Sequence, residues 1–467
     1  MSSGETTLEL IRIFVLLVGA AALVTLLARR IHLPYTVALV AFGLVAGAFA
    51  APLSISITPE LVLVVLLPAL VFEASYQTDF AKLRPVLGGV FTLAGPGVFV
   101  SAAIVALALK YGAGMPGGEA FVVGAMLSAT DPAAVIATFK RLKSPRRLST
   151  LVEAESVFND GTGIVIFAIA VAFVSRPVGP VEIGFTFVSV AVISTVMGAV
   201  AGYVASRILP SVGDHLIEIS LSVVLAYGTY LVADALHQSG IIATAVAGIV
   251  LGNYGTSHGL TARTSEALET VWEFVAFLAT AFVFLVVGFA IPVRALANVA
   301  IPIGWAILAA LVGRAVIAYL LLGLWRLAHL RMQKRQRSWA AGRRPKAAFD
   351  RARRALDRWP GTPNIQTADT GAEPIVHRAS APSDDGPWPF EWLHVVFWSG
   401  LRGAVSTALA LSLPVDFPNR ANLQAITFGV VLFTLVFQAT TADVVVSRWG
   451  RKPKRHREAA DAMSPTP

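Results

Sequence analysis

A cluster of polar and acidic residues lies inside a stretch of the chain that is otherwise apolar. The stretch runs from Leu148 to Val174, which is long enough to cross a bilayer, and the cluster reads Glu153-Ala154-Glu155-Ser156-Val157-Phe158-Asn159-Asp160-Gly161. An ionised carboxylate at the centre of a spanning helix costs about 2.5–3.5 kcal/mol on insertion scales. Residues of this kind usually face a bundle interior or a water-filled cavity and often mark ion pathways. We therefore expect this cluster to carry the function of the chain.

A second buried acid is expected on the preceding apolar segment. Asp131, in the run Ser128-Ala129-Thr130-Asp131-Pro132, lies about as deep in its segment as Asp160 does in the next one, and only the loop 140–147 joins them. These two carboxylates, together with the oxygens of Ser156 and Thr130, could give Na⁺ an oxygen shell. Asp160 can hold a proton or a cation but not both. That competition is sufficient to couple two opposing fluxes.

Two arginines, Arg314 and Arg402, fall near the middle of apolar segments, where a charged side chain needs partners. Position favours an ion pair between Glu155 and Arg314, which would be structural and would dock their two segments on each other. Arg402 would then set the local potential where its own segment is interrupted by Gly400 and Gly403. Spacing does not decide between this assignment and the exchanged one.

The remaining acids of the apolar segments are weaker candidates. Glu73 borders an inner funnel on one interpretation and is an interfacial acid on the other. Glu273 follows Trp272 and is expected at the membrane interface. Asp234 and His237 lie at the end of a segment and are expected to be in contact with water.

Composition places the chain among polytopic membrane proteins. It has 467 residues, of which 56% are hydrophobic and 14% charged, and its mean hydropathy is +0.71. A soluble protein carries about 25% charged residues. The absence of cysteine excludes disulfides, thiolate metal sites and a cysteine nucleophile. The net charge of +9 is attributed to cytoplasmic loops rather than to nucleic-acid binding.

The apolar blocks predict an all-α protein with thirteen transmembrane helices. If the N-terminus is outside and the C-terminus is cytoplasmic, most of the 37 Lys and Arg fall on the cytoplasmic side, as the positive-inside rule requires. The expected location is a cell (inner) membrane. The predicted spans are 8–28, 34–50, 58–76, 85–109, 118–139, 148–174, 183–206, 214–236, 239–254, 266–291, 300–326, 390–414 and 422–447.

The odd number of spans predicts two inverted six-helix repeats on either side of the seventh span. Spans 5 and 12 correspond in the two repeats, and each contains a helix-weakening run, at Pro132 and at Gly400–Gly403. We expect both to be discontinuous and to cross each other, because interrupted helices at matched positions indicate a binding site.

The chain divides by composition into four parts. Residues 1–326 carry spans 1–11, and 390–447 carry spans 12 and 13. Between them, 327–389 is a cytoplasmic insert, basic in its first half and rich in Pro, Thr, Ala and Asp in its second. The basic half is expected to lie on anionic lipid, and the second half to be a flexible linker. Residues 448–467 form a cytoplasmic tail.

Four runs resemble those of the monovalent cation:proton antiporter family. The resemblance is strongest to its electroneutral branch, the bacterial and archaeal sodium/proton antiporters related to the animal sodium/hydrogen exchangers, and it covers about spans 2 to 13. The runs are Thr130-Asp131-Pro132, Glu155-Ser156-Val157-Phe158-Asn159-Asp160-Gly161, Trp272-Glu273-Phe274 and Gly400-Leu401-Arg402-Gly403-Ala404.

This resemblance implies a homodimer, in which a dimerisation domain supports a mobile core that moves the ion site like an elevator. It implies that Asp160 and Asp131 bind the cation or proton. Ser156 and the Thr130 carbonyl would contribute, as would Glu73 through water. It further implies that Asn159 beside Asp160 goes with one-for-one exchange, that Glu155 pairs with a membrane arginine, and that no cofactor is needed. The insert 327–389 is longer than in compact prokaryotic relatives.

The leading hypothesis is therefore electroneutral exchange of Na⁺ or Li⁺ for H⁺ by a secondary transporter, not an enzyme. A K⁺/H⁺ antiporter is the nearest alternative, since oxygen ligands alone do not fix ion size. A cation channel would need a continuous pore and a selectivity ring. An intramembrane aspartic protease would need two Asp sharing a proton. The Ser, Thr and Asn neighbours and the two arginines favour ion binding.

Overall fold

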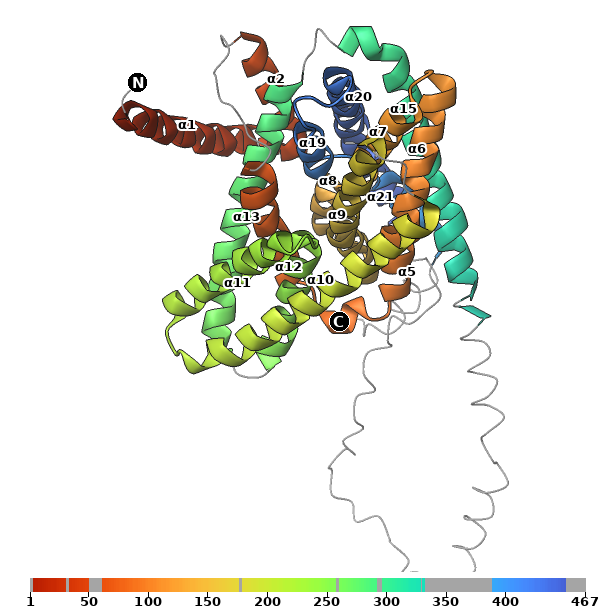
Figure 1. Cartoon of the computed structure of the whole chain (residues 1–467). Helices are drawn as coiled ribbons and strands as arrows, with labels where there is room; N and C mark the ends of the chain where they lie inside the picture. Colours follow the sequence, from red (N-terminus) through yellow and green to blue (C-terminus); the bar gives the residue numbers. More distant parts are fainter. Residues whose placement is uncertain are drawn as a thin grey trace, which may run out of the picture. The chain divides into compact units, whose positions relative to one another are not determined.

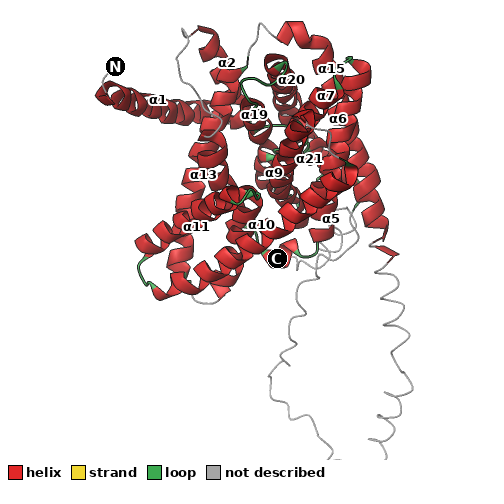
Figure 2. Cartoon of the chain, in the orientation of Figure 1, coloured by secondary structure: helices red, strands yellow, loops and turns green. Residues whose placement is uncertain are grey.

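The computed structural model describes residues 3–30, 33–49, 61–175, 179–257, 260–291, 296–328, 330–331 and 389–450. All regular secondary structure in these ranges is helical (Figure 2). Residues Met1–Leu322 and Pro389–Pro467 form one compact unit. A second unit is Gly323–Trp388, of which 323–328 and 330–331 are described, as helix. The predicted insert 327–389 and tail 448–467 lie largely outside the described residues.

Every predicted span overlaps a helical segment, but only seven helices in the described part of the chain have the length and hydropathy of a full span. These are Leu87–Gly112, Arg146–Val174, Val181–Ser211, His215–Ala235, Ala262–Phe289, Ala297–Ala328 and Arg420–Trp449. The other predicted spans correspond to shorter apolar helices or to pairs of half-helices. The fold is all-helical as predicted, while the count of thirteen spans and the inverted repeat stay predictions.

One group of helices, here called the α13 bundle, packs around the long helix α13. In this group α2 and α3 both lie against α13, α12 lies against α3, and α11 lies against α12 (Figure 1). Trp272 of α13 is packed on Phe72 of α3, with ring centroids 4.6 Å apart. Its members are α1 (Ser3–Arg30), α2 (Tyr35–Phe49), η1–α3 (Leu61–Tyr76), α11 (His215–Ala235), α12–η4 (Gly240–Gly255) and α13 (Ala262–Ala290).

A second group, here called the α9 bundle, surrounds the helix that carries the polar cluster. Helix α7 packs on α6 and α9, while α15 packs on α6 and α20. Its members are α4 (Phe80–Leu83), α5 (Leu87–Thr92), η2 (Leu93–Gly97), α6 (Val98–Gly112), α7 (Gly117–Met126), α8 (Ala133–Leu142), α9 (Arg146–Ser175), η5 (Ala297–Val299), α15–η6 (Ala300–Leu321), α18 (Glu391–Trp398), α19 (Ala404–Leu411), α20 (Arg420–Phe433), η7 (Thr434–Ala439) and α21 (Thr440–Trp449).

Helix α10 (Pro180–Ile208), which ends in the short turn η3 (Leu209–Ser211), lies between the two bundles. It packs mainly on α12 and α11 of the α13 bundle and also touches α9. Only 11% of its apolar window is buried within the chain, so that most of its surface faces outward.

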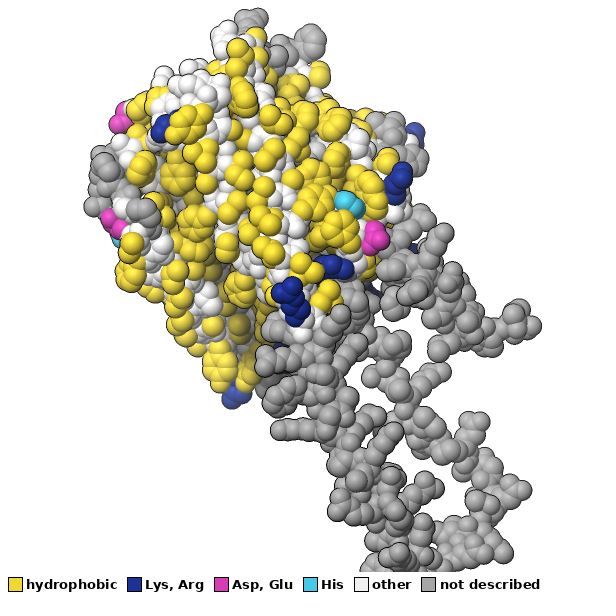
Figure 3. Space-filling model, turned by 90° about the vertical axis from the view of Figure 1, so that its right-hand side faces the viewer, with side chains coloured by type: hydrophobic (Ala, Val, Ile, Leu, Met, Phe, Trp, Pro, Cys, Tyr) yellow, Lys and Arg dark blue, Asp and Glu magenta, His cyan; other side chains and the backbone are white. Residues whose placement is uncertain are grey.

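The surface of this unit has the composition expected of a lipid-facing protein. On the face drawn in Figure 3, hydrophobic side chains predominate and charged ones are few. On α10 and α11 the exposed side chains include Phe185, Val196, Val224 and Val232. Exposed apolar side chains in such numbers are stable in a bilayer but not in water.

Two predicted spans are each divided into half-helices. Helix α7 ends at Met126 and α8 begins at Ala133, directly after Pro132, which cannot donate to a preceding carbonyl. Helix α18 ends at Trp398 and α19 begins at Ala404, directly after Gly403. The half-helices expose unpaired backbone groups inside the unit, and these groups need partners.

Candidate ion-binding site

The two interruptions meet inside the α9 bundle. The backbone amide of Asp131, in the break between α7 and α8, donates to the carbonyl of Leu401, in the break between α18 and α19, at 2.9 Å. Four half-helix ends therefore converge on one place. Two are N-termini, with partial positive charge, and two are C-termini, with partial negative charge.

Asp131 serves both N-termini. Its Oδ1 accepts from the amide of Ala133 at the start of α8, at 3.1 Å, and its Oδ2 accepts from the amide of Ala404 at the start of α19, at 3.3 Å. A carboxylate is the side chain that stabilises helix N-termini, through hydrogen bonds and through the helix dipole. Each oxygen retains a lone pair for another donor or for a cation.

Arg402 serves the C-terminal end of α7. The side chain is buried, and its Nη1 donates to the carbonyls of Ser128 at 2.8 Å and Ala129 at 3.0 Å, while its Nη2 donates to Ser101 Oγ at 3.2 Å. Its backbone amide donates to Thr434 Oγ1 at 3.1 Å. Its buried charge is thus placed against helix carbonyls, where a cation is favoured.

Arg314, from the last turn of α15, serves the C-terminal end of α18 and pairs with Glu155. Its Nε donates to the carbonyl of Val396 at 2.9 Å, and its Nη2 donates to Ser399 Oγ at 3.0 Å. Nη1 and Nη2 donate to the two carboxylate oxygens of Glu155 at 2.5 and 2.9 Å. Both side chains are 3% exposed or less. The structure therefore brings together the pair that position favours, in the bidentate geometry of strong charge-assisted hydrogen bonds.

Two glycines make room for these side chains. A Cβ on Gly400 would lie 2.7 Å from Cγ of Arg314, and a Cβ on Gly403 would collide with the carboxyl group of Asp131. The residues that the sequence singled out as weakening the helix therefore also allow the close approach of the two capping side chains.

The α9 side of the site is fixed by bonds to the first break. Asn159 Nδ2 donates to Thr130 Oγ1 at 2.9 Å, and Ser156 Oγ donates to the Thr130 carbonyl at 3.2 Å. Both contacts are consistent with the helical spacing of Ser156, Asn159 and Asp160 on α9. The Thr130 oxygens and the polar side chains of α9 are therefore gathered in one place.

Two oxygens in this place lack a hydrogen-bond partner. Asp160 Oδ1 and Asn159 Oδ1 are both buried, and neither accepts a hydrogen bond. Asp160 also interacts electrostatically with Asp131 and Glu155. Buried carboxylate and amide oxygens normally have partners, and oxygens of these types bind hard cations such as Na⁺. The arrangement can accept one small cation, or one proton on Asp160.

The other acids lie farther from this cluster. Glu73 of α3 is half-buried, accepts from Gln77 Nε2 at 2.8 Å and has Lys140, Glu153 and Glu273 as its charged neighbours. Glu273, Asp234 and His237 are exposed.

Trp272, which precedes Glu273 in the sequence, is buried in the α13 bundle, where its Nε1 donates to Ser222 Oγ at 3.0 Å. A tryptophan beside a charged residue has the same local sequence pattern whether it lies at the membrane interface or is buried inside a helix bundle.

Sequence reasoning missed several residues that hold the site. Ser101 and Thr434 bind Arg402, and Ser399 binds Arg314. Ser399 lies inside the second break and could have been named as a candidate. Ser101 and Thr434 lie in ordinary apolar runs that carry no local signal.

Comparison with known proteins gives consistent matches along nearly the whole chain. Residues 16–448 match the family described as sodium/hydrogen exchanger, transmembrane. The Na⁺/H⁺ antiporter ApNhaP of Aphanothece halophytica is 34% identical over 424 residues, covering 90% of this chain and 70% of that protein. The Na⁺/H⁺ antiporter NhaH of Halobacillus dabanensis is 30% identical over 450 residues, covering 93% and 96%.

A solved structure has the same fold. The sodium proton antiporter MjNhaP1 of Methanocaldococcus jannaschii, determined at pH 8, superposes with a TM-score of 0.71. The match covers 96% of this chain and 100% of that one, at 18% identity.

Proposed function

The chain belongs to the sodium/hydrogen exchanger family, and we propose that it exchanges Na⁺, or Li⁺, for H⁺ across the membrane, one for one. The observation that carries this proposal is the buried, unpartnered Oδ1 of Asp160, which lies on a spanning helix among oxygens suited to a hard cation. The relatives ApNhaP and NhaH are named as Na⁺/H⁺ antiporters, which supports Na⁺ and H⁺ as the substrates.

The proposed cation site consists of Asp160, Asp131, Ser156 and the Thr130 carbonyl, with Asn159 beside it. Support comes from the contacts that gather these groups, since Ser156 and Asn159 are both bonded to Thr130. Glu73 would contribute through water. Its half-buried position suits this role, and its charged neighbours are two acids, Glu153 and Glu273, and one base, Lys140.

The fixed charges explain why one mobile charge would be exchanged in each direction. Arg314 is engaged by Glu155, and Arg402 by the carbonyls at the end of α7. Asp131 is engaged by two helix N-termini. In the described part of the chain, by contrast, Asp160 Oδ1 is buried and accepts no hydrogen bond. Because a bare carboxylate is costly at this depth, Asp160 would be neutralised by a proton or a cation in turn.

Alternating access would come from movement of the α9 bundle against the α13 bundle. The cation site is formed mainly by the α9 bundle. The bonds of Arg402 and Asp131 between the two half-helix pairs, together with the bond of Arg314 to α18, would keep it intact while it moves. The α13 bundle would form a homodimer in an inner membrane, with the N-terminus outside and the C-terminus cytoplasmic.

Proteoliposomes with an internal pH dye test the proposal. We expect Na⁺ or Li⁺ to trigger proton efflux that does not change when the membrane potential is clamped at different values. Triggering by K⁺ alone would instead identify a K⁺/H⁺ antiporter. A cation current without counter-movement of protons would indicate a channel and contradict the proposal.

A further inference from the structure

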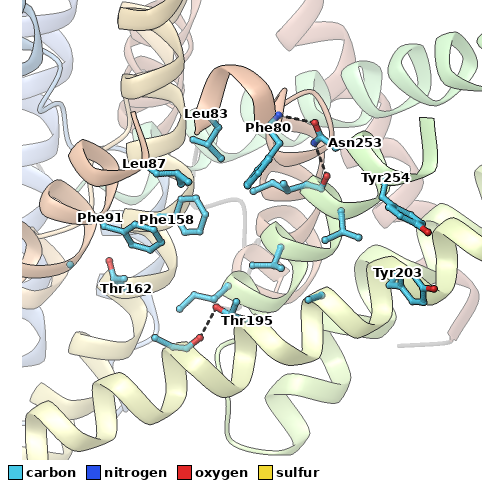
Figure 4. Close-up of a pocket in the computed structure, with 18 of the residues that line it drawn as sticks. Phe80, Leu83, Leu87, Phe91, Phe158, Thr162, Thr195, Tyr203, Asn253 and Tyr254 are labelled. Carbon is cyan, nitrogen blue, oxygen red and sulfur yellow. Dashed lines mark hydrogen bonds between the residues drawn. The ribbon is translucent and has the colours of Figure 1, made fainter. Parts of the chain in front are cut away.

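A long apolar cavity lies at the boundary between the two bundles, separate from the cation site. Its volume is about 880 Å³, and its walls come from α4, α5 and α9 on one side and from α10, α12 and η4 on the other (Figure 4). A cavity of this size accommodates a ligand larger than a few water molecules. Water would require polar partners, and nearly all of this lining is apolar.

The α10 wall has a shape suited to a thin, extended occupant. Residues Phe187, Ala191, Thr195, Ala199 and Tyr203 follow one another at intervals of four and line the cavity along one face of the helix. The three middle residues are small and leave a channel, while an aromatic ring stands at each end. From Ala191 to Tyr203 the channel is about 18 Å long, comparable with half of a hydrocarbon core of about 30 Å.

The opposite wall is formed by larger apolar side chains. Leu87 and Phe91 of α5 face the channel, and Phe91 packs against Phe158 of α9 with ring centroids 6.1 Å apart. Figure 4 shows these two rings and Leu83 on one side of the space and Thr195 and Tyr203 on the other. The occupant would therefore contact helices of both bundles.

Most polar side chains of the lining are gathered at one end of the cavity, while the hydroxyls of Thr162 and Thr195 each donate to a carbonyl of their own helix. Asn253, Tyr254 and Ser257 lie there, at the end of the η4 segment, together with the exposed ring of Tyr203. Asn253 is held in place because its Oδ1 accepts from the amide of Phe80 at 2.7 Å and its Nδ2 donates to the carbonyl of Thr78 at 2.8 Å. A cavity that is apolar along its length and polar at one end matches an amphiphile lying parallel to the helices.

We propose that this cavity binds one acyl chain of a bilayer phospholipid, with the headgroup beside Asn253 and Tyr254. The chain reaches the cavity from the bilayer, because α10 presents apolar side chains to lipid on its neighbouring faces, such as Val192 and Val196, both 56% exposed. The acyl chain packs against Phe158 and Thr162, the residues on α9 that lie two positions before and after Asp160.

Photolabelling of the full-length chain tests this site directly. The protein is reconstituted in nanodiscs of phosphatidylcholine that carries a diazirine on one acyl chain, and labelled peptides are mapped by mass spectrometry. We expect adducts concentrated on residues 87–95, 187–203 and 246–253, above the level on the exposed apolar face of α11. Equal labelling over all apolar surfaces would overturn the proposal.

Variants that fill the channel provide the specific control. Thr195→Trp places a ring in the middle of the channel, where it takes the space of the acyl chain, so labelling of residues 87–95 should fall to the level on the exposed apolar face of α11. The matched variant Val196→Trp adds the same ring one residue away, outside the cavity lining, and should leave labelling unchanged. Thr195→Leu is a milder filling variant, used if Thr195→Trp does not elute as a single species. Undiminished labelling of residues 87–95 in a well-folded filling variant would show that the acyl chain does not bind here.

Discussion

Asp131 lies in the break between α7 and α8 and binds the start of α19. Arg402 lies in the break between α18 and α19 and binds the end of α7. Asp131 accepts from the amide of Ala404, two residues after Arg402, and Arg402 donates to the carbonyl of Ala129, two residues before Asp131. The negative side chain meets helix N-termini and the positive one meets a C-terminal end, so that both buried charges are stabilised by backbone dipoles. The positive charge of Arg402 is then not available to neutralise Asp160, and this is the physical basis of the proposed exchange.

The Glu155–Arg314 pair is expected to determine stability rather than cation affinity. Glu155→Gln leaves the Arg314 guanidinium buried with an incomplete set of acceptors, and breaking a buried pair in this way costs about 3–5 kcal/mol. We expect a lower yield of folded protein and a lower melting temperature by fluorescence-detected size exclusion. The matched variant Glu153→Gln, two residues earlier on α9 and half-buried, should behave like the native chain.

For the Glu155–Arg314 pair, native stability combined with lower cation affinity would be the contradicting result. A Glu155→Gln protein with native stability and a strongly raised KM for Na⁺ would assign Glu155 to the cation site and contradict the structural role.

Gly403→Ala tests whether Asp131 must lie against the start of α19. The added Cβ would collide with the Asp131 carboxyl group, and overpacking of this kind costs about 1–3 kcal/mol. We expect exchange to be reduced at least about tenfold, because Asp131 must give up its bond to Ala404. Gly304→Ala on α15, where nothing lies within 4 Å of the new Cβ, is the matched control. Native exchange rates in Gly403→Ala would mean that this contact is dispensable.

Thr130→Val tests the link between the first break and Asn159. The change keeps the shape of the side chain but removes the acceptor for Asn159 Nδ2, leaving a buried donor unpaired at a cost of about 1–3 kcal/mol. We expect the KM for Na⁺ to rise about tenfold as the orientation of Asn159 is lost. Thr195→Val, whose hydroxyl bonds only within its own helix at the Ala191 carbonyl, should leave KM unchanged. An unaltered KM in Thr130→Val would remove Asn159 from the site.

Competition between proton and cation predicts a definite pH dependence. Protonation of Asp160 removes the carboxylate that binds Na⁺, so the apparent KM for Na⁺ should rise as pH falls, by about tenfold per pH unit on the acidic side. The maximal rate at saturating Na⁺ should change much less. Initial rates of exchange in proteoliposomes with equal pH on both sides measure both quantities. A maximal rate that falls with pH at constant KM would indicate inhibition from a separate protonation site.

Several parts of this architecture could be predicted from residues alone. Pro132 beside Asp131, and Gly400 and Gly403 around Arg402, mark helix interruptions because of their backbone chemistry, and the structure places breaks there. The spacing of Ser156, Asn159 and Asp160 also predicts that these side chains lie close together on one side of a helix. These signals are local, which is why one sequence is sufficient to find them.

The partners of the buried charges could not be predicted in the same way. Arg402 binds backbone carbonyls of Ser128 and Ala129, and a carbonyl is present at every residue. Ser101 and Thr434 reach Arg402 from distant segments, so only the packing of α6 and η7 identifies them. Trp272 shows the same limit, since burial by neighbours in the α13 bundle decided its role.

The central claim is that Asp160 releases a proton when it binds a cation, and titration of the purified protein measures this directly. Na⁺ is added to the full-length protein in weakly buffered detergent solution, and the change in proton concentration is followed with a pH dye. We expect release of about one proton per chain on saturation with Na⁺. Asp160→Asn should remain folded and release none. No release from the native protein, or equal release from Asp160→Asn, would contradict the claim.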